Sequence, residues 1–426
     1  FIEIFNKLLS CVNLEFEYNR LSSKKEKIIY LNQSIFDFSL SKNDALEEMI
    51  SDVLEGNVNF EYNKKLHLST QKILDNINQY KPKTAIIGGG IFGITSALNL
   101  DRNDFDIDLF EKNNDILEEA SSINQYRLHR GYHYPRSFQT ALSSKQGTNT
   151  FLKEYNCVSS PTTQYYAIAS NGSKINSKEF IKFMEDIGLN YKITNLEFVK
   201  NVESIFEVEE NLFNPTKLYK ECTEKIDKSN INLKLNSEFK KNDLKNYDYI
   251  INASYANLNK TLPEQYQQNY QFELCEKPII QLPPLFKDKG IIIMDGPFKC
   301  IDPLGGTSYH VMGHVTHAIH STNTGKSPQI PKEYLPFLNK GIIKNPKITN
   351  IDKFIKGGMV FFKDIEKSKH IGSMFTIRTV LPNLDHNDAR PSIVTKHTDK
   401  LYSLFSGKIS TCVDTSDQLL SYILKN

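Results

Sequence analysis

The chain has 426 residues, of which 39% are hydrophobic and 24% charged, a composition that is ordinary for a soluble globular protein and excludes a disordered one. Its 52 basic and 50 acidic side chains nearly cancel at a net charge of +2, so no overall field points to nucleic acid. No apolar run reaches the roughly eighteen residues of a transmembrane span, and the six cysteines form no C-x-x-C pair. We therefore expect reduced thiols, a cytoplasmic location and a small-molecule substrate.

Residues 1–80 precede the first recognisable motif and are interpreted as an N-terminal extension of unknown role. Within them, Asp44–Leu54 and Ser69–Tyr80 are apolar at the helical period and are predicted to be helices. Pro82, with a lysine on either side, marks a hinge to the rest of the chain.

A complete nucleotide-binding βαβ unit follows in residues 84–112. A buried parallel strand is predicted at Thr84–Ile87, a helix at Ile91–Leu100 and a second strand at Phe105–Phe110. The first strand runs directly into G-x-G-x-x-G, in which the glycines permit a sharp turn, close approach to a pyrophosphate and tight packing of the helix.

Glu111 ends the second strand, where a carboxylate accepts hydrogen bonds from ribose hydroxyls and would repel the 2′-phosphate of NADP. We expect this unit to bind its cofactor through Gly88, Gly90, Ile91, Phe92, Gly93, Glu111 and Lys112.

A polar and aromatic segment, residues 120–137, comes next and has neither helical nor strand periodicity. It contains the pattern R-x-H-x-G-Y-H-Y-P-R-S between Arg127 and Ser137. With the later segments, it resembles the D-amino-acid oxidase (DAO) superfamily of FAD-dependent oxidoreductases, in particular an uncharacterised branch with this signature. The resemblance extends from about residue 83 to the C-terminus. It implies an α/β fold, in which a Rossmann-like FAD-binding domain of the glutathione-reductase type is joined to a β-sheet substrate domain.

The resemblance also implies where the residues of this segment lie. Phosphate contacts are expected from Ser121 and Ser122, and contacts along the flavin ring from Gln125, Tyr126 and Arg127. The substrate side is expected to hold the catalytic candidates His129, Tyr132, His133 and Arg136.

Later segments complete the expected site. By the same resemblance, Ala253 and Ser254 let the backbone approach the ADP moiety, and Phe298 and Asp302 lie at the mouth of the site. Gly407, Lys408 and Ile409 are expected beside the flavin, where a cation stabilises the negative charge of its reduced form. Arg378 and Arg390 compete as anchors for an anionic substrate.

The two domains are expected to alternate along the chain. FAD-binding parts are assigned to residues 81–160, 211–262 and 355–426, and substrate-domain parts to residues 161–210 and 263–354. Further strands are predicted at Thr162–Ala169, Ile231–Leu235, Tyr247–Ser254, Tyr270–Leu282 and Gly290–Met294. Further helices are predicted at Ser177–Ile187 and Ser416–Leu424, with another that ends at Ile226.

Four closely spaced histidines, His310, His314, His317 and His320, suggest a metal site if they lie on a helix. Interleaved Val311, Val315 and Ile319 favour a strand instead, with His317 on the face opposite the other three. No metal site is therefore expected.

The leading hypothesis is an FAD-dependent oxidase or dehydrogenase. It removes a hydride from a carbon that bears an amine or hydroxyl, in an amino acid, hydroxy acid or amino sugar, with His129 or His133 as a candidate base. One alternative is a redox-neutral, mutase-like flavoenzyme that acts on a nucleotide sugar, and another is an FAD-binding assembly protein without turnover. An NAD enzyme is disfavoured, because its Rossmann domain would continue through alternating strands and helices.

Overall fold

The computed structural model describes residues 27–31, 34–38, 80–159, 161–296, 298–382 and 390–425. The chain divides into two compact units, Phe1–Pro82 and Lys83–Asn426. In the first, strands β1 (Lys27–Leu31) and β2 (Ser34–Phe38) form an antiparallel pair. The helix predicted at 44–54, and the one predicted at 69–80 as far as residue 79, lie outside the described residues.

The second unit contains a six-stranded sheet in the order β10-β4-β3-β11-β19-β18, parallel except for the β18–β19 pair. Its strands are β3 (Lys83–Ile87), β4 (Asp106–Phe110), β10 (Asn232–Lys234), β11 (Tyr249–Asn252), β18 (Ile393–Lys396) and β19 (Leu401–Phe405). Segments far apart in the chain therefore meet in one parallel sheet, which confirms the Rossmann-like prediction.

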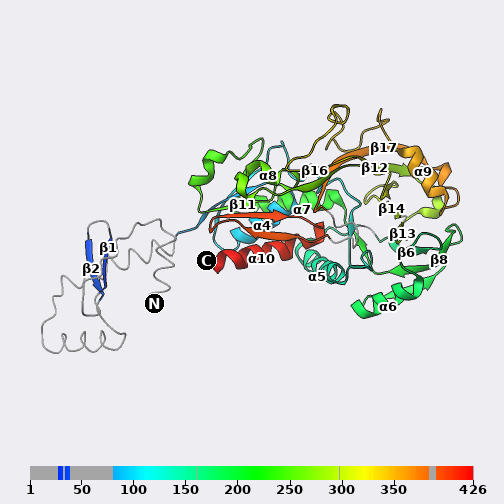
Figure 1. Cartoon of the computed structure of the whole chain (residues 1–426), viewed down its shortest axis with the longest axis horizontal. Helices are drawn as coiled ribbons and strands as arrows, with labels where there is room; N and C mark the ends of the chain where they lie inside the picture. The colour runs from blue at the N-terminus through cyan, green and yellow to red at the C-terminus, as the bar shows by residue number, and fades with distance from the viewer. Residues whose placement is uncertain are drawn as a thin grey trace. The chain divides into compact units, whose positions relative to one another are not determined.

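Helices pack against this sheet around one apolar core. Ten of the eleven residues of α4 (Ile91–Asp101) are buried, and α10 (Cys412–Leu424) runs alongside it (Figure 1). Ile86, Leu109, Phe151 and Leu419 all belong to this core. The parallel connections are completed by α7 (Pro215–Asp227), which Asn214 caps through the amides of Thr216 and Lys217, and by the short α8 (Leu258–Thr261).

One helix, α5 (Phe138–Glu154), has no counterpart in the sequence prediction. It is rich in serine and threonine, and its buried face consists largely of small residues, so its apolar period is weak. Small size allows close packing: a Cβ on Gly147 would lie 2.9 Å from the carbonyl oxygen of Ser410. The helix thereby fixes the turn that leads into α10.

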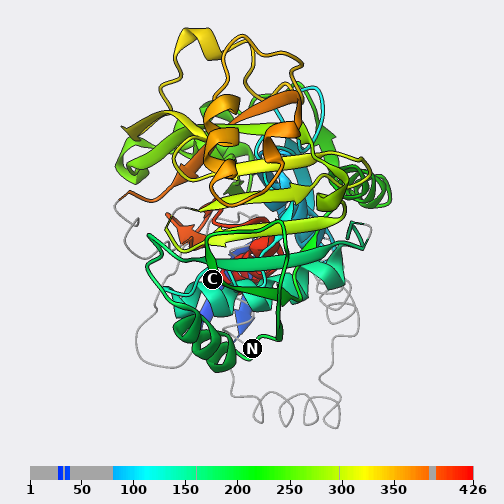
Figure 2. The same cartoon turned by 90° about the vertical axis from the view of Figure 1, so that its right-hand side faces the viewer.

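A nine-stranded sheet forms the rest of the second unit (Figure 2). Its strands are β6 (Thr163–Ala169), β7 (Tyr191–Thr194), β8 (Val202–Val208), β12 (Tyr270–Gln281), β13 (Lys289–Met294), β14 (Lys299–Pro303), β15 (His310–His314), β16 (Ile319–Gly325) and β17 (Lys369–Val380). Apolar cores lie against α6 (Ser177–Ile187) and α9 (Ile351–Met359). After β8, the chain leaves this sheet, and β9 (Asn211–Leu212) pairs with β5 (Arg127–Leu128).

One predicted domain boundary needs correction. Residues 355–426 were assigned as a whole to the FAD-binding domain, but β17 pairs with β12 over eleven registered positions and belongs to the nine-stranded sheet. The chain therefore returns to the parallel sheet only at β18. None of the helices in the described ranges combines the length and apolarity that a bilayer crossing needs.

Candidate active site

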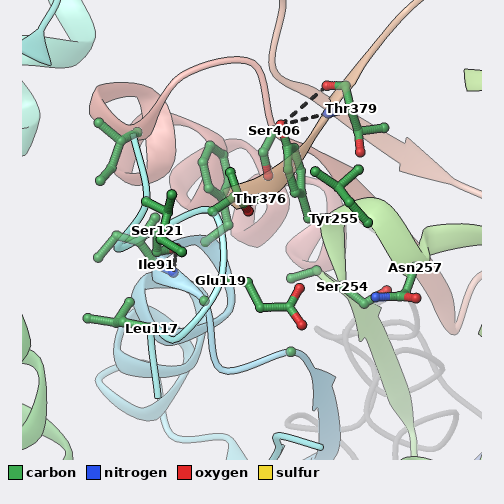
Figure 3. A pocket seen from close by; sticks show the side chains of 18 of the residues that line it. Ile91, Leu117, Glu119, Ser121, Ser254, Tyr255, Asn257, Thr376, Thr379 and Ser406 are labelled. Atoms are coloured by element: carbon green, nitrogen blue, oxygen red, sulfur yellow. Dashed lines mark hydrogen bonds between the residues drawn. The ribbon is translucent and has the colours of Figure 1, made fainter. Parts of the chain in front are cut away.

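A cavity of about 360 Å³ lies where the carboxyl ends of the parallel strands meet one face of the nine-stranded sheet. Figure 3 shows its wall: Ile91 comes from the nucleotide unit and Ser121 from the segment 120–137, Ser254 and Tyr255 follow β11, and Thr376 and Thr379 belong to β17. The tyrosine hydroxyl accepts a 3.0 Å hydrogen bond from the Thr379 amide and so links the two domains. Ligands of open α/β sheets bind at this edge.

The glycines of the first turn allow the cavity to extend onto the backbone. Gly88 has φ +109°, and a Cβ there would lie 2.9 Å from the carbonyl oxygen of Ala253. At Gly93 a Cβ would lie 1.9 Å from the Gly88 oxygen, so only glycine lets α4 pack this close to β3. Gly90 is the N-cap residue of α4 and makes no side-chain capping hydrogen bond. The Ile91 amide donates to Ser121 Oγ at 3.1 Å. The helix N-terminus is therefore available to an anion such as pyrophosphate.

Glu111 lies at the end of β4 with its carboxylate buried against the same turn. Its oxygens accept hydrogen bonds from the backbone amides of Gly89 at 2.7 Å and Asn113 at 2.8 Å. Lys112, next in the chain, pairs with Glu119 at 2.7 Å. Phe92, Ala253, Ser254, Gly407 and Ile409 line the cavity as the sequence analysis expects.

Arg127 lies at the inner end of the cavity, with a side chain only 1% exposed. Its guanidinium donates to Glu210 Oε1 at 2.8 Å and contacts Asp302 on β14 at short range. Gln125 Nε2 donates to the same aspartate at 3.2 Å. Arg127, expected from the sequence along the flavin ring, thus lines the cavity while two carboxylates from distant parts of the chain hold its guanidinium.

His129 is the histidine on the cavity wall. Burial, with the charges of Arg127 and Lys408, holds the pKa of this imidazole well below its ordinary value, so the ring is neutral at pH 7. Its Nδ1 is buried without a hydrogen-bond partner, 3.9 Å from Glu210 Oε1. Gln125 Oε1, also on the wall, is likewise buried without a partner.

Lys408, which follows β19 in the chain, lines the cavity. Its ammonium lies 4.4 Å from the centre of the Tyr134 ring and 3.4 Å from the carbonyl oxygen of Arg390. Burial, with Arg390 nearby, lowers the pKa of Lys408 to about 7.

The sheet side of the wall carries Cys275 and Lys277 from β12, with Thr376 and Arg378 from β17. Antiparallel register places Glu273 opposite Arg378, and the arginine Nε contacts that carboxylate at short range. Arg378 therefore lies on the wall, as a substrate anchor requires, but already has a carboxylate partner.

Several predicted site residues lie behind the wall rather than on it. Tyr132 donates its hydroxyl to the Asn190 carbonyl at 2.6 Å, and Arg136 Nε donates to the buried Asp295 at 2.6 Å. His133 packs against Phe298, with ring centres 4.9 Å apart. These contacts anchor the segment and turn its outer side chains away from the cavity.

Two residues expected at the cofactor share this placement. Tyr126 is 2% exposed and donates its hydroxyl to the carbonyl oxygen of Ser122 at 2.6 Å, while its ring packs edge-on against Phe213. Ser122 itself donates to the carbonyl oxygen of Glu119 at 3.1 Å. Both residues shape the loop from behind.

The four clustered histidines lie on two strands and the turn between them. His310 and His314 are on β15 and His320 is on β16, whereas the ring of His317 in the turn lies 4.1 Å from that of His314 instead of on the opposite face. His320 forms a 2.7 Å hydrogen bond with Glu276. No three histidine, cysteine or acidic side chains of the described residues are arranged to hold a metal ion.

Comparison with known proteins agrees with this geometry. Residues 83–217 match a family described as FAD dependent oxidoreductase (DAO). The chain is 24% identical to the FAD-dependent monooxygenase FPY4 of Fusarium mangiferae, over 79% of this chain and 90% of that protein. It is 37% identical to the FAD-dependent monooxygenase kojA of Aspergillus flavus over 17% of each chain.

Solved structures share the fold. Reduced L-α-glycerophosphate oxidase of Mycoplasma pneumoniae, with FAD bound, matches with a TM-score of 0.61 at 13% identity, over 81% of this chain and 95% of that one. Glycine oxidase of Geobacillus kaustophilus matches with a TM-score of 0.59 at 12% identity, over 81% and 96%. These structural matches confirm the predicted fold class, and the family match over residues 83–217 agrees with the predicted superfamily and FAD cofactor. The helix N-terminus at Gly90, the glycine turn and Glu111 fit FAD.

Replacing Arg127 by methionine is expected to lower the free energy of unfolding of the FAD-free chain by about 3–5 kcal/mol, because it leaves Glu210 and Asp302 buried without their cation. Chemical denaturation measures the change. As a control, Lys182→Met breaks an exposed pair with Asp186 and is expected to leave the stability nearly unchanged. An R127M variant as stable as the wild type would contradict a tightly paired guanidinium.

The pKa of Lys408 generates a prediction about pH. Because folding lowers it from 10.5 to about 7, the unfolded chain binds more protons between these values, and this residue's contribution makes stability rise with pH across that window. Denaturation of the FAD-free wild type and K408M at pH 7 and pH 9.5 tests this. The wild type is expected to gain stability relative to K408M at the higher pH, and an equal response of both proteins would refute the burial of the ammonium.

Proposed function

We propose that this chain, an FAD-dependent oxidoreductase of the DAO superfamily, oxidises a small polar, anionic substrate at a carbon that bears an amine or a hydroxyl group. FAD, when bound, supplies the acceptor for two electrons. The observation that carries the proposal is the neutral His129 on the cavity wall, with a buried ring nitrogen that has no partner.

Oxidation at such a carbon requires the amine or hydroxyl to release a proton. His129 is neutral at pH 7 and is therefore in the form that accepts a proton. The nearest carboxylate, Glu210 Oε1, lies 3.9 Å from Nδ1 and stabilises the imidazolium that results. His133, the other base considered from the sequence, lies behind the wall, which favours His129.

The charge of the wall supports an anionic substrate. The wall carries three basic side chains, Lys277, Arg378 and Lys408. Among the described residues, a carboxylate pairs with Arg378 but with neither lysine. Basic groups attract a negative charge more strongly in a partly desolvated cavity than the same groups do in water.

A second candidate comes from the relative named as an FAD-dependent monooxygenase, at 24% identity over most of both chains. In that class of reaction, a nicotinamide nucleotide rather than the substrate carbon supplies the electrons. The two candidates therefore differ in which compound removes the visible absorption of the cofactor under anaerobic conditions.

The test mixes the FAD-loaded chain anaerobically with amino acids, hydroxy acids and amino sugars, and separately with NADH and NADPH. We expect one substrate class to bleach the flavin without a nicotinamide nucleotide. Bleaching by NADH or NADPH alone would support the monooxygenase and overturn the proposal. A flavin that no compound bleaches would instead favour a redox-neutral reaction.

With a bleaching substrate in hand, His129→Asn is expected to slow the anaerobic bleaching by about 100- to 10,000-fold while FAD stays bound, because the proton acceptor is lost. The matched control is His397→Asn, a histidine outside the cavity that contacts Ser403 Oγ at 2.8 Å. Stopped-flow absorption measures both rates. An H129N rate close to that of the wild type would eliminate His129 as the base.

A further inference from the structure

Strand β12 presents alternate side chains to opposite sides of the nine-stranded sheet. Cys275 and Lys277 lie on the cavity side. Glu276, between them, is fully buried on the other side, where its carboxylate accepts hydrogen bonds from the Asn350 amide at 2.8 Å and Ser373 Oγ at 2.6 Å. This fixed carboxylate holds the strand in register, so the direction of the Lys277 side chain toward the cavity is built into the sheet.

The other lysines of the cavity wall have partners. Lys112 pairs with Glu119, Lys260 pairs with Glu238, and Lys408 lies over the Tyr134 ring. Lys277 differs from them, because no described carboxylate lies within ion-pair distance of its ammonium.

The acids near Lys277 are already bound by other groups. Asp302 is held by Arg127 and Gln125, and Glu273 is held by Arg378. An ammonium that is partly buried without a counter-ion is costly to the fold, and a ligand that carries a negative charge would remove that cost.

We propose that Lys277 binds the anionic group of the substrate, and that this group is a carboxylate. The inference rests on the proposed function. It assigns to Lys277 the anchoring role predicted for Arg378 or Arg390, both of which also lie on the wall. Arg136 is bound to Asp295 behind the wall, and Arg378 is bound to Glu273.

Two features favour a carboxylate over a more highly charged group. Lys277 offers one unpaired positive charge, which a single carboxylate neutralises. Asp302 acts electrostatically on Lys277, and its carboxylate disfavours a dianion such as phosphate beside the lysine. Thr376, which faces the cavity from β17 opposite Cys275, supplies a hydroxyl donor beside the same position.

The experiment titrates the FAD-loaded chain with acetate at constant ionic strength and follows the visible absorption of the flavin. Acetate is expected to change the spectrum saturably, whereas uncharged acetamide is not. In K277M the apparent Kd for acetate is expected to rise about tenfold or more, because the charge-assisted contact is lost. The matched control is K299M, since Lys299 is also partly buried on the same sheet but lies over the Phe361 ring, 4.8 Å from its centre, rather than in the cavity.

The outcomes separate clearly. A wild-type spectrum that acetate does not change, or equal acetate binding by K277M and the wild type, would overturn the proposal. Phosphate binding more tightly than acetate would overturn the carboxylate assignment. K277Q, which keeps much of the side-chain length and removes only the charge, is measured in parallel, so that a loss of FAD by K277M does not decide the result. Acetate binding requires no turnover, and its failure is therefore distinguishable from the failure of the proposed oxidation.

Discussion

The buried ion pairs of Arg127 are the interaction on which the cavity depends. The arginine belongs to the segment that follows the nucleotide unit, while Asp302 lies on β14 and Glu210 lies between β8 and β9. Three distant parts of the chain are thereby fixed at one point. Because a buried guanidinium without its carboxylates is strongly destabilising, these parts have little freedom to move apart. His129 follows two residues later, so its position is set by the same contact.

The distribution of charge around the cavity follows from this arrangement. Glu210 and Asp302 both bind Arg127, and Glu273 binds Arg378, so each of these acids already contacts an arginine. Among the described residues, Lys277 has no carboxylate within ion-pair distance, Lys408 lies over an aromatic ring, and Arg390 also lines the cavity. The inner end is therefore positive through pairing rather than through an excess of basic residues in the sequence, and the nearly neutral net charge of +2 is consistent with this.

The polar segment 120–137 divides into two functions once it is folded. Ser121, Gln125 and His129 face the cavity, whereas Tyr126, Tyr132 and Arg136 are used to hold the loop against Phe213, Asn190 and Asp295. A loop without regular structure needs such anchors, because its backbone supplies few hydrogen bonds of its own. Its dense polar composition therefore reflects support of the site as much as contact with ligands.

The nucleotide unit was predictable from the sequence alone, because its glycines, strands and terminal Glu111 act on neighbours within about thirty residues. The sequence also predicted most strands of both sheets, from their apolar alternation. Which polar side chains face the cavity, and which are paired, depends instead on contacts between distant segments. Arg127 meets Asp302 across 175 positions of the chain, and Arg378 meets Glu273 across 105. A residue's type gives its charge but not its partner. Lys277 was therefore indistinguishable from any other lysine until the register of β12 and β17 placed it in the cavity, where no carboxylate of the described residues pairs with it.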